Sequence, residues 1–350
     1  MSRAGRKIDH INYALSTASA NGAGFEDVKF VHQSLPDCAI DNISLQTKIG
    51  ELILSSPFFI NAMTGGGGDK TKTLNEGLAI AARETGLMLS VGSQMAALKD
   101  STERETYSIT RKVNPEGMII GNLGSEATLD QAKYAVDMIE ANALQIHLNV
   151  VQELAMPEGD RSFAGALNRI ESIVNGLQVP VIVKETGFGM SKETANKLKA
   201  AGVSIIDVGG YGGTNFSKIE NHRQDRQLAF FNDWGIPTVP SIVETSSTFP
   251  SIIASGGISQ SIDVIKSLSL GACAAGIAGT FLRILIEHGP EGLIEEINAM
   301  KMEQTMIMTA LGAKNIVDLR KLPIILSGPT YHWLHMRGLE PDKFARRSDC

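Results

Sequence analysis

Eight short apolar runs recur along the chain, and amphipathic stretches of helix length separate them. The runs are Phe58–Met63, Met88–Gly92, Met118–Leu123, Ala143–Asn149, Val179–Lys184, Ser204–Val208, Ser251–Ser255 and Ala272–Ala278. Near-continuous apolar strands that alternate with helices indicate a parallel sheet with both faces covered. Eight such units predict an α/β fold of the (β/α)8 TIM-barrel type, and an open doubly wound sheet is the alternative.

The strand–helix pattern also predicts how the 350 residues are divided. We expect a single domain over residues 1–350, with an N-terminal arm at 1–55, the barrel at 56–285 and a C-terminal helical tail at 286–350. Helices are predicted at Thr73–Thr85, Thr128–Ala141, Phe163–Leu177, Lys192–Ala201, Ile262–Leu268 and Glu291–Leu311, with Thr128, Ser191 and Ser259 as helix-starting residues. Residues 209–250 are expected to form one long loop, and loops of that length are usually functional or mobile.

Composition excludes several classes of function. The net charge is −6, which gives no support to a general nucleic-acid or membrane-surface role. Three scattered cysteines predict neither a disulfide framework nor a zinc site, and they suit a reducing cytoplasm. The first ten residues are polar and basic and do not resemble a secretory signal, and no apolar run reaches the length of a membrane span.

Glycine-rich turns follow the last two predicted strands. Strand seven ends in Ala-Ser-Gly256-Gly257-Ile258, and strand eight ends in Ala-Gly-Ile-Ala278-Gly279-Thr. Backbone N–H groups at such turns, facing a helix N-terminus, bind phosphate, and barrels commonly place a phosphate site there. The simpler interpretation is that glycine only makes short turns. The occurrence of both turns on adjacent strands favours phosphate binding.

Small polar residues end the first three predicted strands. Ala62, Met63 and Thr64 follow strand one, Ser93 follows strand two, and Asn122 lies at the end of strand three. The carboxyl ends of barrel strands meet at one mouth, so these groups are expected to surround a common ligand. Hydroxyl and amide groups in that position suit a flat heteroaromatic ring.

Lys184 closes the fifth predicted strand after an apolar run. An unpaired ammonium is costly to bury, so a lysine there indicates a function or a partner. It could form a Schiff base, or it could lie beside a flavin and stabilise the anionic reduced ring. The structural alternative is an ion pair with Glu185 or Asp207.

The fourth predicted strand carries the densest polar cluster. Alternation along the strand places Gln145, His147 and Asn149 on one face, and Gln152 and Glu153 follow on the next loop. One carboxylate with phosphate oxygens and waters is the usual arrangement for Mg²⁺. The structural alternative for His147 is a hydrogen-bonded histidine of the barrel core.

A further group of positive residues, Arg6, Lys7 and His10, lies in the N-terminal arm. Such a group is usually a solvated surface. If the arm folded over the barrel mouth, the group would supply the anion clamp that an acidic protein needs.

Taken together, these residues resemble the type 2 isopentenyl diphosphate delta-isomerases, which depend on FMN. The resemblance covers nearly the whole chain. It rests on Arg6-Lys7-x-x-His10, Met63-Thr64-Gly65-Gly66, Gly92-Ser93-Gln94, His147-Leu148-Asn149 with Gln152-Glu153, and Gly212-Gly213-Thr214. Phe216 stands where many relatives have tryptophan, and it preserves an aromatic wall. Motifs of other enzyme classes are missing: there is no P-loop, no H-E-x-x-H and no G-x-S-x-G.

The resemblance implies an isomerase of isoprenoid biosynthesis that interconverts isopentenyl and dimethylallyl diphosphate, with reduced FMN, Mg²⁺, and NAD(P)H as the flavin reductant. It also implies a homotetramer or homo-octamer. Lys184, His147 and Gln152 would be catalytic, with flavin N5 as the acid and base. The residues implied for the flavin are Ala62, Met63, Thr64, Ser93, Asn122, Lys184, Thr214, Gly256, Gly257, Ile258, Ala278 and Gly279. Those implied for the diphosphate are Arg6, Lys7, His10, His147, Asn149 and Gln152, with Glu153 on the metal.

Three alternatives remain open at this stage. An FMN-dependent 2-hydroxyacid oxidase needs a His base beside an Arg, and only His222 and Arg223 are near in sequence. A barrel like inosine-monophosphate dehydrogenase needs a nucleophilic cysteine in residues 209–236, where none occurs. A flavin- or phosphate-binding regulator would leave the polar fourth strand unexplained.

Overall fold

The computed structural model describes residues 22–223 and 226–347. Eight parallel strands form a closed barrel in the order β10-β11-β4-β5-β6-β7-β8-β9. Their bounds are β4 Phe58–Ile60, β5 Leu89–Ser90, β6 Ile119–Gly124, β7 Ala143–Leu148, β8 Val181–Glu185, β9 Ile205–Asp207, β10 Ser251–Ser255 and β11 Ala274–Ile277. All eight predicted strands are present, and closure between β11 and β4 confirms the barrel over the open sheet.

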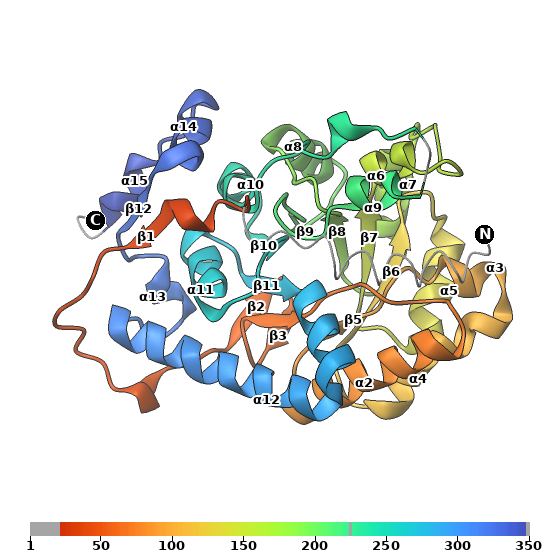
Figure 1. The fold of residues 1–350 in the computed structure, drawn as a ribbon, viewed down its shortest axis with the longest axis horizontal. Coiled ribbons are helices and arrows are strands. Elements are labelled where there is room, and N and C mark those ends of the chain that lie inside the picture. The colour runs from red at the N-terminus through yellow and green to blue at the C-terminus, as the bar shows by residue number, and fades with distance from the viewer. Residues whose placement is uncertain (1–21, 224–225, 348–350) are drawn as a thin grey trace.

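Helices connect the strands and cover the outside of the barrel (Figure 1). They are α2 Asp69–Thr85, α3 Met95–Lys99, η3 Ser101–Arg104, α4 Glu105–Val113, α5 Leu129–Ile139, α6 Val150–Ala155, α7 Ala166–Gly176, α8 Lys192–Ala200, α9 Phe216–Asn221, η4 Ala229–Phe231, α10 Thr238–Ser246, α11 Ser261–Leu270 and α12 Gly279–Leu311. None of these helices is both long and apolar enough to cross a membrane.

Helix starts follow local chemistry in two of the three predicted places. Thr128 and Gln131 form a reciprocal capping box at α5, and the Ser191 hydroxyl accepts the Thr194 N–H at α8. The prediction for Ser259 was wrong, because α11 begins one residue later and Gln260 caps it together with Asp263. The Asp263 carboxylate accepts from the backbone N–H groups of Ser259 and Gln260 at 3.3 and 3.2 Å, so the acidic side chain of the first turn supports this helix start.

One other expectation was wrong, and one was confirmed. Residues 209–250 are not one long loop, because they contain α9, η4 and α10. The predicted tail helix Glu291–Leu311 is confirmed, because α12 consists of two helices separated at Gly289, whose φ of 70° is not helical, and the second of them ends at Leu311. Pro290 follows directly in the first turn of the second helix, where its missing N–H costs no helical hydrogen bond.

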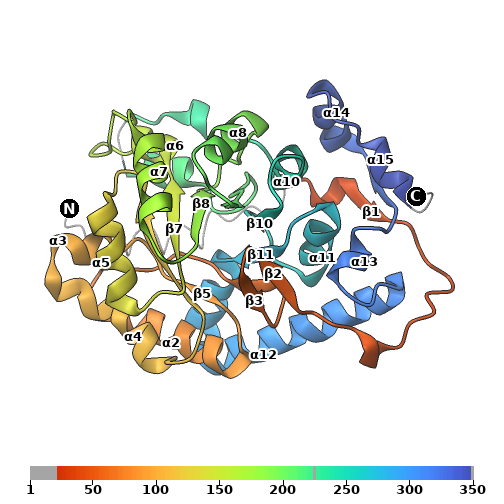
Figure 2. The same ribbon diagram turned by 180° about the vertical axis from the view of Figure 1, so that it is seen from behind.

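The segments outside the barrel were not predicted in detail. They form η1 Phe25–Asp27, β1 Val28–Phe30, η2 Ile40–Asn42, β2 Thr47–Ile49 and β3 Leu52–Leu54 before the barrel, and α13 Ile316–Leu319, β12 Ile324–Leu326, α14 Gly328–Met336 and α15 Asp342–Ala345 after it. Strand β1 pairs with β12 in antiparallel register. The two end segments therefore lie side by side at one end of the molecule, as Figures 1 and 2 show.

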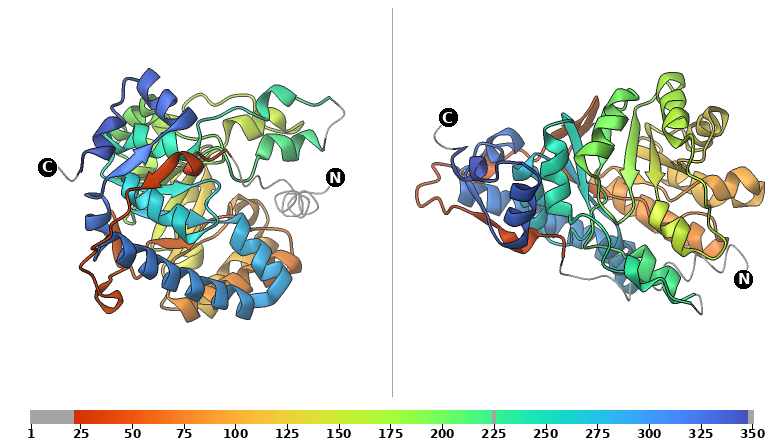
Figure 3. Two further views of the ribbon diagram at one scale, coloured as in Figure 1. Left: turned by 60° about the vertical axis from the view of Figure 1, so that its left-hand side comes forward. Right: turned by 90° about the horizontal axis from the view of Figure 1, so that it is seen from above.

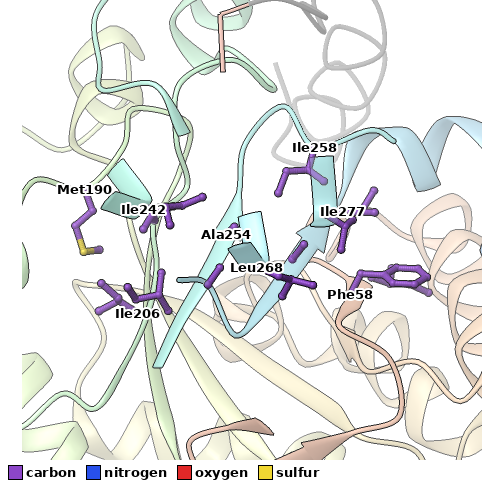
Figure 4. Packing of buried hydrophobic residues seen from close by; sticks show 14 of the residues in the cluster. Phe58, Met190, Ile206, Ile242, Ala254, Ile258, Leu268 and Ile277 are labelled. Carbon is purple, nitrogen blue, oxygen red and sulfur yellow. The ribbon is translucent and has the colours of Figure 1, made fainter. Parts of the chain in front are cut away.

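Two apolar clusters flank the barrel wall. Inside, the β2–β3 hairpin places Ile49 and Leu54 against inward residues such as Phe59, Ile182 and Ile253, all almost fully buried. Outside, alternate strand residues pack against the helices, as Figure 4 shows for Ile206, Ala254 and Ile277 with Ile242 and Leu268. Because the hairpin fills the barrel at the strand amino ends, the carboxyl ends are left for a ligand. Figure 3 shows the helical ring from two further directions.

Candidate active site

A cavity of about 420 Å³ lies at the carboxyl ends of the barrel strands. Every predicted site residue in the described part of the chain lines it. These residues are Ala62, Met63, Thr64, Ser93, Asn122, His147, Asn149, Gln152, Glu153, Lys184, Thr214, Gly256, Gly257, Ile258, Ala278 and Gly279. Arg6, Lys7 and His10 lie outside the described residues. The barrel therefore brings the predicted set together, while the role of each residue remains a prediction.

A buried polar network forms the floor of this cavity. The Asn61 amide donates to Asp207 at 2.9 Å, and the Gln145 amide donates to Asn61 Oδ1 at 3.3 Å. Gln145 Oε1 accepts from Ser90 at 2.9 Å and from Asn122 at 3.1 Å. All five side chains are at most 3% exposed. Buried polar groups that satisfy one another define a rigid platform, so the residues above them are held in place.

Lys184 has a partner, so the ion-pair interpretation of this residue is correct. Its Nζ lies 3.3 Å from Asp207 Oδ2, donates to Ser255 Oγ at 3.0 Å and donates to the Glu185 carbonyl at 3.1 Å. The partner carboxylate comes from Asp207, and Glu185 contributes only its carbonyl. Because Lys184 still lines the cavity, the ion pair fixes a positive charge at its wall.

His147 and its neighbours form the adjoining part of the wall, because β7 pairs with β8 and His147 lies beside Lys184 in register. His147 Nδ1 lies 2.9 Å from Asn122 Oδ1, which fixes the orientation of the ring. Gln152 Nε2 lies 3.5 Å from Glu220 Oε1, at the long end of hydrogen-bonding distance. Glu220 is fully buried and also forms an ion pair with Arg223. The sequence did not single out Glu220, because α9 lies far from the fourth strand along the chain.

Glu153 is held by two hydrogen bonds. Its Oε1 accepts from Asn149 Nδ2 at 2.8 Å, and its Oε2 accepts from the Asp160 N–H at 2.8 Å. Burial raises the pKa of the Glu153 carboxyl. Within residues 22–223 and 226–347, no group of three or more His, Cys, Asp or Glu side chains is placed to hold a metal ion. A metal at Glu153 would therefore take its remaining ligand oxygens from other sources, such as a bound phosphate and water molecules.

The loop after the first barrel strand is fixed from α4 and its preceding turn. The N–H groups of Gly67 and Gly68 donate to Glu103 Oε2 at 2.9 and 3.1 Å. The Asn75 amide donates to the Thr106 carbonyl at 2.6 Å, and Asn75 also binds the Thr64 hydroxyl. These contacts, which the sequence did not predict, hold the loop that carries Met63 and Thr64 into the cavity.

The glycine turns fit a phosphorylated cofactor. A Cβ on Gly213 would lie 2.6 Å from the Gly257 nitrogen, so the loop after β9 closely approaches the glycine turn after β10 and no side chain fills the space between them. The Thr71 hydroxyl also lines the cavity, is 1% exposed and lacks a hydrogen-bond partner among the described residues. An open glycine cradle and an unsatisfied buried hydroxyl are features that a bound polar ligand would complete.

The sequence of this chain matches one protein-family model and many full-length relatives. A family model described as FMN-dependent dehydrogenase matches residues 79–325. Isopentenyl-diphosphate delta-isomerases from Geobacillus sp. (strain WCH70) and Bacillus thuringiensis (strain Al Hakam) are 57% and 58% identical over 349 residues, covering 99% of this chain and 100% of each relative.

Solved structures share the fold at low identity. A flavocytochrome b2 variant with sulfite bound has a TM-score of 0.69 at 19% identity, covering 95% of this chain and 88% of that one. A mandelate oxidase variant with (S)-mandelic acid has a TM-score of 0.66 at 18% identity, covering 93% and 95%. These likenesses support the fold, whereas the full-length relatives identify the subgroup. The chain belongs to the FMN-dependent dehydrogenase family and, within it, to the isopentenyl-diphosphate delta-isomerases.

Proposed function

We propose that this chain interconverts isopentenyl and dimethylallyl diphosphate by adding a proton at C4 and removing one from C2, with reduced FMN, Mg²⁺, and NAD(P)H as the reductant. The arrangement of residues around the cavity is the observation that supports this proposal. Glycine turns suited to a phosphate lie at β10 and β11, and a polar wall of His147, Asn149 and Gln152 lies at β7 and α6. In the strand order β11 and β7 are four positions apart, so the two groups face each other across the mouth.

The residues around the cofactor would bind and orient it. Gly256, Gly257, Ala278 and Gly279 would hold the phosphate through backbone N–H groups. The Lys184–Asp207 pair would keep a positive charge beside the ring, which favours the anionic reduced form. When bound, the reduced flavin supplies a proton donor and acceptor at N5.

The residues around the substrate would fix its diphosphate and keep its hydrocarbon end in position. His147 and Asn149 would donate to the diphosphate, and Glu153 would bind Mg²⁺ together with diphosphate oxygens. The buried Glu220 would orient the Gln152 amide from behind. Holding both reactants in one geometry supplies much of the rate acceleration that such a reaction needs.

The oxidase alternative has less support from the cavity. Among the described lining residues His147 is the only histidine, and it comes from β7, whereas Arg283 is the only arginine, and it comes from α12. Arg223 is paired with Glu158 and Glu220, and neither Arg223 nor His222 lines the cavity. The described wall therefore has no histidine beside an arginine, which is the arrangement that such an oxidase needs. We further propose that the chain forms a homotetramer or homo-octamer and acts in the cytoplasm.

The decisive experiment starts with the visible spectrum of the protein purified in air, read for bound flavin. NADPH, Mg²⁺ and isopentenyl diphosphate are then added anaerobically in deuterated water. Formation of dimethylallyl diphosphate with deuterium in the C4 methyl group, without stoichiometric NADPH use, is the expected result. Bound flavin with oxidation of lactate or glycolate and no isomer would transfer the activity to the oxidase class. No flavin binding after added FMN would refute the proposal.

A further inference from the structure

The N-termini of α2 and α12, which both lie beside the cavity, differ in how their backbone donors are satisfied. Helix α2 starts after Gly68, and the N–H groups of Gly67 and Gly68 both donate to the Glu103 carboxylate. This end therefore already holds an anion supplied by the chain itself. A carboxylate at a helix N-terminus also interacts favourably with the helix dipole, so α2 needs no external anion.

Helix α12 is arranged in the opposite way. Within the described residues no side chain caps its N-terminus, and its first turn contains no acidic residue. Gly279, Thr280 and Arg283 all line the cavity. Residues three and four apart lie on the same helix face, so these three residues present one surface to the cavity. The N-terminus of α12 is left open to an anion at the place where Ala278 and Gly279 turn.

Arg283 is a cation at the end of the helix where the dipole disfavours one. It is exposed, and it forms no ion pair or hydrogen bond with any described residue. Lys184 is the other cationic side chain on the described wall, and it forms an ion pair with Asp207. Helical side chains lean toward the N-terminus of their helix, which carries the guanidinium over the turn that holds Gly279.

We propose that Arg283 is the cationic ligand of the phosphate ester of the bound flavin, an inference that rests on the proposed flavin function. A Cβ on Gly279 would lie 3.7 Å from the Thr214 hydroxyl, so β11, the Thr214 loop and Gly257 converge on one small space. Backbone N–H groups there would orient the phosphate, and Arg283 would neutralise it.

A phosphate could also come from the substrate diphosphate, and the geometry favours the flavin. The side chains suited to the diphosphate, His147 and Asn149, lie at β7, which is across the barrel from β11 and α12. Arg283 therefore stands on the side of the glycine turns and not on the side of the polar wall.

The test compares FMN with riboflavin, which has the same ring and no phosphate. Apoprotein of the wild type, Arg283→Ala and Arg283→Lys is titrated with each flavin, and quenching of flavin fluorescence gives the dissociation constant. We expect Arg283→Ala to weaken FMN binding about tenfold to a hundredfold, as loss of one charge-assisted contact does, and to leave riboflavin binding within about twofold. Arg283→Lys should recover part of the loss. The wild-type preference for FMN should also fall with added salt more than that of the variant.

Lys72→Ala is the matched control, because Lys72 is a cation in the first turn of the neighbouring helix α2, pairs with Glu105 and does not line the cavity. It should bind both flavins as the wild type does. Unchanged FMN affinity in both Arg283 variants would overturn the inference while leaving flavin binding intact. An equal loss for FMN and riboflavin, or a raised KM for the diphosphate with FMN affinity unchanged, would also overturn it. Failure of the wild type to bind either flavin would instead overturn the proposed function.

Discussion

The Asp207→Asn substitution should be among the most destabilising single changes in the chain. Asp207 is fully buried and accepts from Asn61, Ser255 and Gly209 while pairing with Lys184. Two unit charges 3.3 Å apart attract each other by about 5 kcal/mol at an effective dielectric constant of about 20. The asparagine keeps the shape of the side chain but removes the charge and presents an amide to groups that are themselves donors. Removing one partner of a buried pair typically costs about 3–5 kcal/mol, and the residual exposure of Lys184 favours the lower half of that range.

Urea unfolding measures this cost, first with saturating FMN and then with flavin removed, so that a change in ligand affinity is separated from intrinsic stability. The midpoint should fall while the slope stays constant. Asp137→Asn is the matched control, because it makes the same chemical change at an exposed position on α5 and should have little effect.

A double-mutant cycle shows whether the loss of unfolding free energy comes from the Lys184 ammonium that is left without a partner. Combining Lys184→Met with Asp207→Asn removes the unpaired charge, so the double variant should lose at least about 2 kcal/mol less than the sum of the two single changes. A loss below about 1 kcal/mol for Asp207→Asn, or additive effects in the cycle, would refute this reasoning.

Three further predictions concern the cavity and its support. Gly213→Ala would place a Cβ 2.6 Å from the Gly257 nitrogen, and it should weaken FMN binding at least tenfold in a fluorescence titration; unchanged affinity would show that the turns do not form the cradle. Glu153→Gln should raise the Mg²⁺ concentration needed for half-maximal activity at least tenfold without changing FMN affinity, and an unaltered Mg²⁺ dependence would place the metal elsewhere. Burial raises the pKa of Glu185 from its ordinary value of 4.5 to about 8, although its carboxylate accepts two backbone N–H bonds. Because the folded pKa is the higher one, the stability that protonation contributes is complete below about pH 4.5 and is lost as the pH rises through 8. The wild type should therefore lose more stability than Glu185→Gln between pH 5 and pH 9 in urea unfolding, and parallel curves would contradict the shift.

The fold and the position of the site could be predicted because both depend on a repeated pattern. Each apolar run had the length of a buried strand, and the barrel brings all carboxyl ends to one mouth, so residues such as Ser93 and Thr214 meet whatever their separation in sequence. Helix α10 was missed because Pro240 and its β-branched neighbours are poor helix formers. Tertiary burial fixes that helix, and Pro240 lies in its first turn, where no backbone donor is lost from the helix.

The supporting contacts could not be predicted, because they join elements that are distant in the chain. Glu220 reaches Gln152 from α9, and Glu103 reaches the first loop from the turn before α4. A sequence pattern identifies which residues face the mouth, but it contains no signal for which carboxylate approaches which donor. The same reason explains why Arg283 was not predicted: it lies inside a helix, beyond the strand ends at which a barrel is expected to carry its chemistry.

The pairing of β1 with β12 has a consequence for how the chain folds. The Ser327 hydroxyl donates to the Asp27 carbonyl across 300 residues of chain. At a synthesis rate of about 5–20 residues per second, strand β1 waits about 15–60 s for its partner to leave the ribosome. During that time it presents an unpaired strand edge, the usual starting point for pairing with other chains. Its length of only three residues limits that hazard. The join between the chain ends is therefore a late step of folding, because β12 is synthesised after every strand of the barrel.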